Sequence, residues 1–235
     1  MNLAILCSGP IPEHYYPVTG GGHESVFGRL FDQVPHAKLT FTEIDVSAGE
    51  YPNHPSDFDG YIVGGSSRSV YEDVPWINDL AQYYRELYAA GSKLVGICFG
   101  HQMLAQALGG EVSLSPNGWG IGVKSFEVYE HEAWMAPSLD RCEVLMSCQD
   151  QVQSLPPDSK ILAGSDFCPV GLLKVGENML GIQGHPEFLP SFSEALMDAR
   201  TDRIPADTIK AARATLNQST NTKELATWMI NFLQS

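Results

Sequence analysis

The chain has 235 residues, 43% of them hydrophobic, so it is long enough to bury a complete core as one domain over residues 1–235. Its net charge of −14 argues against nucleic acid and anionic membranes as partners. Five cysteines without a C-x-x-C pair indicate neither a disulfide framework nor a zinc site. The N-terminus has no basic leader and no apolar span, so we expect a cytoplasmic protein.

The first 110 residues alternate between strand and helix patterns. Short apolar runs occupy residues 3–9, 39–46, 60–65 and 93–98, and apolar residues return every three or four positions in segments 23–34 and 76–91. Strands that alternate with helices form right-handed crossovers. We therefore expect a doubly wound α/β unit with a mainly parallel sheet covered on both faces.

From residue 111 to 183 the pattern changes to closely spaced strands separated by turn residues. The runs lie at 122–130, 142–148, 160–165 and 170–183, and they predict antiparallel strands, the last of which returns to the main sheet. Segments 190–202 and 222–235 have helical composition. Neither repeats nor linker-like segments divide the chain.

Cys98 lies between an apolar, β-branched run and a helical segment, in the stretch "VGICFGHQMLAQALGG" at 95–110. A residue on such a strand-to-helix turn is pushed out of the sheet edge, and the amides of the helix N-terminus face its side chain. That environment lowers the pKa of a thiol. A buried structural cysteine is the alternative reading of this stretch taken alone.

A cysteine nucleophile needs a base, and the base needs a partner that fixes its tautomer. Among the seven histidines, His185 follows a predicted core strand and has a carboxylate, Glu187, fixed two residues away around Pro186. A single His-x-Glu is a weak signal by itself. The pair gains weight only together with Cys98.

Together, Cys98 on its turn, "GIQGHPEF" at 181–188 and "VGGSSRSVYEDVPWI" at 63–77 resemble the class I glutamine amidotransferase family. The resemblance covers nearly the whole chain. It implies a three-layer α/β/α, flavodoxin-like fold with an added antiparallel region, and a Cys98, His185, Glu187 triad that hydrolyses a γ-glutamyl amide without a cofactor or metal. Stand-alone members and γ-glutamyl peptidases are similar in "GICFGHQ" and "GWGIGV".

The resemblance also places residues around the reacting amide. The amide of Phe99, the residue after the nucleophile, is an oxyanion donor that the turn itself supplies. The resemblance implies Gly65 as the second donor, Gly64 as part of the same close-approach turn, and Gln102 as a substrate contact. Where GMP synthetase glutaminase domains have Ser-His-Gly-Asp-x-Val, this chain has "SCQDQV" at 147–152, which leaves Asp150 as an ammonium partner.

Three hypotheses remain open from the sequence. The first is a hydrolase of glutamine or a γ-glutamyl small molecule, which acts alone or supplies ammonia to a separate synthase, since the chain contains no G-x-x-x-x-G-K-[ST] loop. The second is a noncatalytic regulatory subunit, against which the three triad residues argue. The third is a cysteine peptidase in which His101, three residues after Cys98, is the base.

Overall fold

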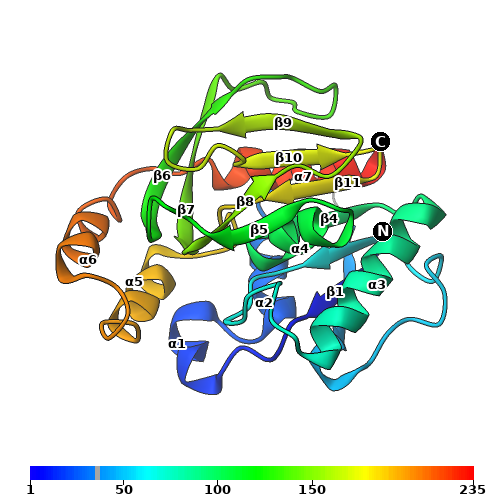
Figure 1. Cartoon of the computed structure of the whole chain (residues 1–235), viewed down its shortest axis with the longest axis horizontal. Coiled ribbons are helices and arrows are strands. Elements are labelled where there is room, and N and C mark those ends of the chain that lie inside the picture. The colour runs from blue at the N-terminus through cyan, green and yellow to red at the C-terminus, as the bar shows by residue number, and fades with distance from the viewer. Residues whose placement is uncertain (35–37) are drawn as a thin grey trace.

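A nine-stranded sheet organises the fold in the computed structural model, which describes residues 1–34 and 38–235 (Figure 1). The order across the sheet is β2 (Thr40–Asp45), β1 (Asn2–Cys7), β3 (Gly60–Val63), β4 (Leu94–Ile97), β11 (Met179–Ile182), β10 (Leu172–Val175), β9 (Ser159–Gly164), β6 (Gly120–Val128) and β7 (Arg141–Cys148). The first five run parallel, and β10, β9, β6 and β7 continue the sheet with antiparallel pairing. This confirms the predicted mainly parallel sheet with an added antiparallel region.

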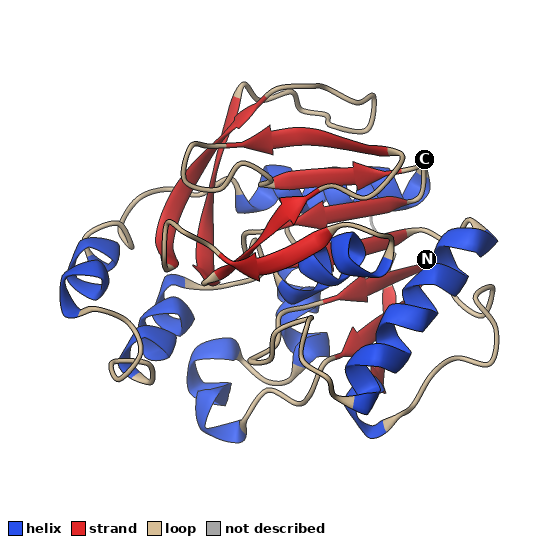
Figure 2. Ribbon diagram, viewed as in Figure 1, coloured by secondary structure: helices blue, strands red, loops and turns tan. Residues whose placement is uncertain are grey.

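Helices cover both faces of the parallel half (Figure 2). On one face, α2 (His23–Phe31) and α7 (Thr222–Gln234) pack against alternate residues of β1. On the other, α3 (Pro75–Ala90) and α4 (Phe99–Ala107) pack against the intervening ones. Because the central strands are buried on both faces, their sequences are continuous apolar runs, as parallel strands require. The three-layer α/β/α arrangement is confirmed.

The smaller elements lie around this frame. They are η1 (Glu13–Tyr15), α1 (Tyr16–Thr19), η2 (Val46–Ala48), the antiparallel pair β5 (Glu111–Leu114) and β8 (Asp150–Ser154), α5 (Pro190–Asp198) and α6 (Ala206–Arg213). The sequence patterns did not indicate β5, β8 or α6. Strands β5 and β8 are short and bury few apolar side chains, and α6 buries only Ile209 and Ala212, so no apolar run marks these elements in the sequence.

The last strand of the sheet in chain order lies at its centre. Strand β11 inserts between β4 and β10, with Ile182 opposite Ile97. Parallel neighbours end at the same edge of a sheet, so the segments that follow β4 and β11 emerge side by side. The candidate site lies at this edge, and the predicted return of the last strand to the main sheet is confirmed.

Candidate active site

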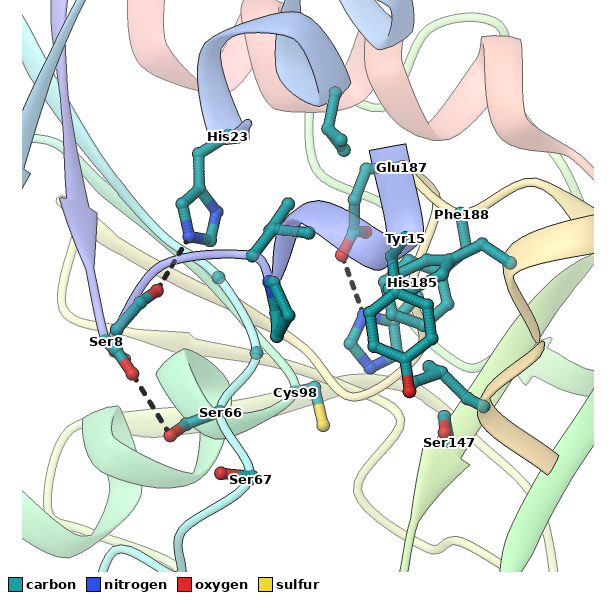
Figure 3. A pocket seen from close by; sticks show the side chains of 18 of the residues that line it. Ser8, Tyr15, His23, Ser66, Ser67, Cys98, Ser147, His185, Glu187 and Phe188 are labelled. Carbon is teal, nitrogen blue, oxygen red and sulfur yellow. Dashed lines mark hydrogen bonds and ion pairs between the residues drawn. The ribbon is translucent and has the colours of Figure 1, made fainter. Parts of the chain in front are cut away.

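Cys98 occupies a sharp turn between β4 and α4. Its backbone has φ 53° and ψ −99°, and Asp158 is the other non-glycine residue with positive φ in the described ranges 1–34 and 38–235. The turn requires glycine on both sides. A Cβ on Gly96 would lie 2.4 Å from the Gly100 carbonyl oxygen, and one on Gly100 would lie 2.3 Å from the Val63 carbonyl oxygen. The predicted strand, turn and helix are confirmed, and the thiol points into a cavity (Figure 3).

His185 and Glu187 follow β11 at the same edge. The amide of Cys98 donates to the Ile182 carbonyl at 2.8 Å, and the amide of His185 donates to the Leu145 carbonyl at 2.7 Å. These bonds bring the His185 segment beside the turn. His185 Nδ1 lies 2.7 Å from Glu187 Oε1, both side chains are buried, and His185, Glu187 and Cys98 line one cavity (Figure 3). The structure therefore brings together three residues that the sequence separates by up to 89 positions, from Cys98 to Glu187.

The electrostatics of this group favour a thiolate and an imidazolium. A hydrogen bond from the Cys148 thiol and the charge of His185 lower the pKa of Cys98, although burial opposes them. Burial would lower the pKa of His185, but the Glu187 carboxylate and the Cys98 thiolate outweigh it and raise that pKa. By contrast, burial raises the pKa of three other cysteines to about 12: Cys7, Cys142 and Cys168. Cys98 is thus electrostatically distinct from the structural cysteines.

The predicted oxyanion residues border Cys98. Gly65 lies against His185, since a Cβ there would be 2.9 Å from His185 Cε1. Gly64 accepts a hydrogen bond from the Gly100 amide at 3.2 Å, which ties this turn to α4. Phe99 is the first residue of α4, so its amide belongs to the helix N-terminus that faces the cavity. The backbone of both segments is therefore close to the place where a substrate carbonyl would meet the thiol.

Gln102 and Asp150 line a second cavity that contains Cys98 but not His185. The Gln102 amide donates to the Asp150 backbone carbonyl at 2.8 Å and to Gln183 Oε1 at 3.2 Å, so both of its N–H donors bind protein groups. The Asp150 carboxylate accepts hydrogen bonds from the hydroxyls of Ser69 and Tyr71. Gln102 and Asp150 both line a cavity next to Cys98, and the bond from Gln102 to Asp150 also attaches β8 to α4.

Two cavities meet at Cys98. The larger, of about 510 Å³, contains Cys98, His185 and Glu187, and much of its wall is apolar: Pro10, Ile11, Pro12, Phe27, Phe188 and Phe192. The smaller, of about 170 Å³, contains Cys98, Gln102 and Asp150 and is mainly polar. Arg200 and Arg203 line both. The nucleophile predicted from the sequence thus stands between an apolar chamber and a charged one.

The other candidates are distributed around these cavities. His101 is fully buried, its pKa is lowered to about 4 by burial, and it lines neither cavity. Trp76 packs on Phe99 with ring centroids 5.7 Å apart, whereas Trp119 lines the smaller cavity. Glu72 pairs with Arg68 within the loop after β3. This geometry favours His185 over His101 as the base.

Several cavity residues were missed by sequence reasoning. Arg200 and Arg203 follow α5 and carry no motif, Ile11 lies in the loop after β1, and Tyr15 ends η1. The apolar residues Phe188 and Phe192, four positions apart, were the one available signal, and their rings contact at 4.6 Å between centroids. Within the described part of the chain, no cluster of three or more His, Cys, Asp or Glu side chains could hold a metal ion. No helix there is long and apolar enough to cross a bilayer.

Comparisons with known proteins identify a family, two relatives and a solved structure that this chain resembles. The model of the family "Glutamine amidotransferase class-I" matches residues 25–199. The chain is 30% identical to γ-glutamyl peptidase 5 of Arabidopsis thaliana over 224 residues, which cover 91% of this chain and 88% of that one. It is 33% identical to γ-glutamyl peptidase 4 of the same plant over 178 residues, 72% of this chain and 69% of that one. A glutamine amidotransferase from Thermotoga maritima has the same fold, with a TM-score of 0.76 at 21% identity over 100% of this chain and 98% of that one.

Proposed function

Because the chain belongs to the class I glutamine amidotransferase family, we propose that it hydrolyses a γ-glutamyl amide bond through a thioester on Cys98. The observation that carries the proposal is the arrangement of Cys98, His185 and Glu187 in one cavity, with Glu187 Oε1 2.7 Å from His185 Nδ1. A binding module has no physical need for a thiol of lowered pKa beside an imidazole of raised pKa. This argues against a noncatalytic subunit.

The proposed reaction proceeds in two halves. The Cys98 thiolate attacks the γ-amide carbonyl, and the amides of Gly65 and Phe99 stabilise the oxyanion. Protonated His185 then gives its proton to the leaving amine, and the γ-glutamyl thioester forms. In the second half, His185 takes a proton from a water molecule that attacks the thioester, and glutamate leaves. Glu187 holds His185 in the required tautomer throughout.

The larger cavity favours a γ-glutamyl peptide or conjugate over glutamine. The leaving amine departs on the side of His185, because His185 protonates it, and His185 lines the cavity of about 510 Å³. Ammonia would leave that volume and its apolar wall unused, whereas a bulky amine would bury apolar surface there. The relatives named γ-glutamyl peptidases support the same choice.

Glutamate release separates the alternatives. The purified protein is incubated with glutathione, with a γ-glutamyl conjugate of an aromatic amine and with L-glutamine, and the Cys98→Ala protein provides the blank. Cys98-dependent release from the first two without any partner is the expected result. Release from glutamine alone would instead indicate a glutaminase that supplies ammonia to a separate synthase. Alkylation of Cys98 no faster than of Cys7 or Cys142 would favour the regulatory subunit.

We also propose that residues 1–235 act as one domain, that no cofactor takes part and that the reaction occurs in the cytoplasm. The first proposal rests on β11, which joins the two halves of the sheet. Limited proteolysis tests it, since two separable domains would give two stable fragments. Dialysis against a chelator tests the second, and cell fractionation tests the third.

A further inference from the structure

Arg200 and Arg203 place two positive charges in the candidate site of a protein whose net charge is −14. They lie one turn apart, since the Arg203 amide donates to the Arg200 carbonyl at 3.0 Å. Both line the two cavities that meet at Cys98. They also lie beyond residues 25–199, the segment that the family model matches.

Neither arginine has a carboxylate partner in the part of the chain that the structure describes. Among the ion pairs of residues 1–34 and 38–235, none involves Arg200 or Arg203, whereas Arg68 in the smaller cavity is neutralised by Glu72 at 2.9 Å. The Arg200 guanidinium donates to Ser147 Oγ at 2.8 Å, and the Arg203 guanidinium lies 5.8 Å from the centre of the Trp119 ring. Both groups are thus held in place by neutral partners. Two like charges held close together are unfavourable unless an anion lies between them.

Asp150 supplies the complementary charge in the smaller cavity. Its carboxylate is oriented by the hydroxyls of Ser69 and Tyr71, and it shares this cavity with both arginines and with Cys98. A cavity of about 170 Å³ with a carboxylate, hydroxyls and two guanidinium groups besides the one that Glu72 neutralises has the chemistry that an amino-acid head group requires. A γ-glutamyl group carries such a zwitterion two methylene groups away from the amide that Cys98 would attack.

From these observations we infer that Arg200 and Arg203 bind the α-carboxylate of the γ-glutamyl group, opposite Asp150 at its α-ammonium. This inference rests on the proposed function. It divides the site into two parts: the smaller cavity holds the glutamyl head and the larger one holds the leaving amine. The arginines are then specificity-determining residues, which select γ-L-glutamyl compounds over other carboxamides that could reach the thiol.

L-γ-Glutamyl-p-nitroanilide is the substrate that tests this assignment, because its leaving amine is aromatic and has no carboxylate. Each of Arg200→Gln and Arg203→Gln should lower kcat/KM about 10- to 100-fold, mainly through KM, which is the usual cost of a hydrogen bond to a charged group. On the α-carboxamide analogue of this substrate, the same variants should have the kcat/KM of wild type. Arg213→Gln is the matched control, since Arg213 pairs with Asp198 and lines neither cavity.

Other outcomes overturn the assignment. An equal loss on both substrates would mean that the arginines stabilise the thiolate or the local fold. Unchanged kcat/KM on both substrates would mean that the arginines do not contact the substrate. If only glutathione, and not its glycine-carboxamide form or the anilide, depended on them, the arginines would bind the carboxylate of the leaving peptide. Arg203 is exposed, so its variant should fold even if loss of the Arg200 contact to Ser147 destabilises the other.

Binding to the Cys98→Ala protein separates this inference from the proposed function. Calorimetric titration with L-glutamate and with its α-amide needs no turnover. Binding of L-glutamate that Arg203→Gln weakens about 10-fold or more, with the α-amide unaffected, would support the carboxylate site even in a protein without hydrolase activity. If the wild-type protein is active but neither arginine variant changes the binding of L-glutamate, the proposed hydrolase stands and the carboxylate site is refuted.

Discussion

Replacement of Glu187 by glutamine measures how far one buried charge sets the reactivity of the site. Glu187 Oε1 lies 2.7 Å from His185 Nδ1, and the two side chains are 4% and 3% exposed. Unit charges about 4 Å apart attract by about 4 kcal/mol at an effective dielectric constant of about 20, equivalent to about three pKa units. The pKa of His185, which burial lowers but Glu187 and Cys98 raise to about 10, should therefore fall to about 7 or below in the variant.

In this variant the lower pKa leaves His185 largely neutral, so the Cys98 thiolate loses its positively charged partner. Loss of a hydrogen bond to a charged group costs about 1.5–3 kcal/mol, so kcat should fall about 10- to 150-fold. The glutamine amide can also donate to Nδ1 and so favour the wrong tautomer of His185. Glutamate release measures the rate, and iodoacetamide alkylation of Cys98 across pH measures the thiolate.

The pH dependence of alkylation gives the sharper test. In wild type, the Cys148 hydrogen bond and the His185 charge lower the pKa of Cys98 to about 5, so alkylation should decline only as pH falls through that value. In Glu187→Gln the decline should move to higher pH, because a neutral His185 no longer stabilises the thiolate. The shift should be partial, because the Cys148 hydrogen bond remains and the direct repulsion between Glu187 and the thiolate is removed. Glu194→Gln, which removes an exposed carboxylate from α5, is the control. A wild-type rate and pH profile in Glu187→Gln would refute the role given to this charge.

Three further predictions test the turn and the base. Cys98→Ala should release no glutamate yet stay within about 1 kcal/mol of wild type in urea unfolding; residual release would exclude Cys98 as nucleophile. Gly96→Ala should lose about 1–3 kcal/mol of stability, because its Cβ meets backbone atoms of Gly100 at 2.4 Å. Gly28→Ala, whose Cβ meets nothing within 4 Å, should gain about 0.5–1 kcal/mol of stability. Equal changes in stability for the Gly96 and Gly28 variants would contradict the close packing at Gly96. His185→Ala should abolish release while His101→Gln keeps the wild-type pH profile, and the reverse would make His101 the base.

Sequence patterns predicted the parts of the fold that local chemistry determines. The strand, turn and helix around Cys98 are contiguous, and a buried parallel strand shows as an unbroken apolar run. Strand β11 was also placed correctly, because its composition matches a core strand. Elements with few buried side chains, such as α6, were missed, since too few apolar residues mark them in the sequence.

In the candidate site too, residues that are close in sequence were predicted, and those that tertiary packing places were not. His185 and Glu187 are two residues apart, so their pairing is visible in the sequence and the 2.7 Å contact agrees with it. Arg200 carries no such signal, because its position depends on how α5 packs beside β7. Gln102 lines the smaller cavity, where its amide donors bind Asp150 and Gln183, and its role as a substrate contact stays a prediction. The catalytic roles of the triad residues and of the oxyanion amides stay predictions.

The central position of β11 has a consequence for how the protein is made. Met179 pairs with Leu94, so β4 keeps a free edge until the ribosome has released about three quarters of the chain. Pairing between such distant segments is slow, and the open edge can meet another nascent chain in the meantime. The same pairing gives the Cys98 amide its acceptor on Ile182 and carries His185 to the thiol. Completion of the sheet and onset of thiol reactivity should therefore coincide. The rate at which Cys98 becomes open to alkylation during refolding would then report when β11 pairs with β4.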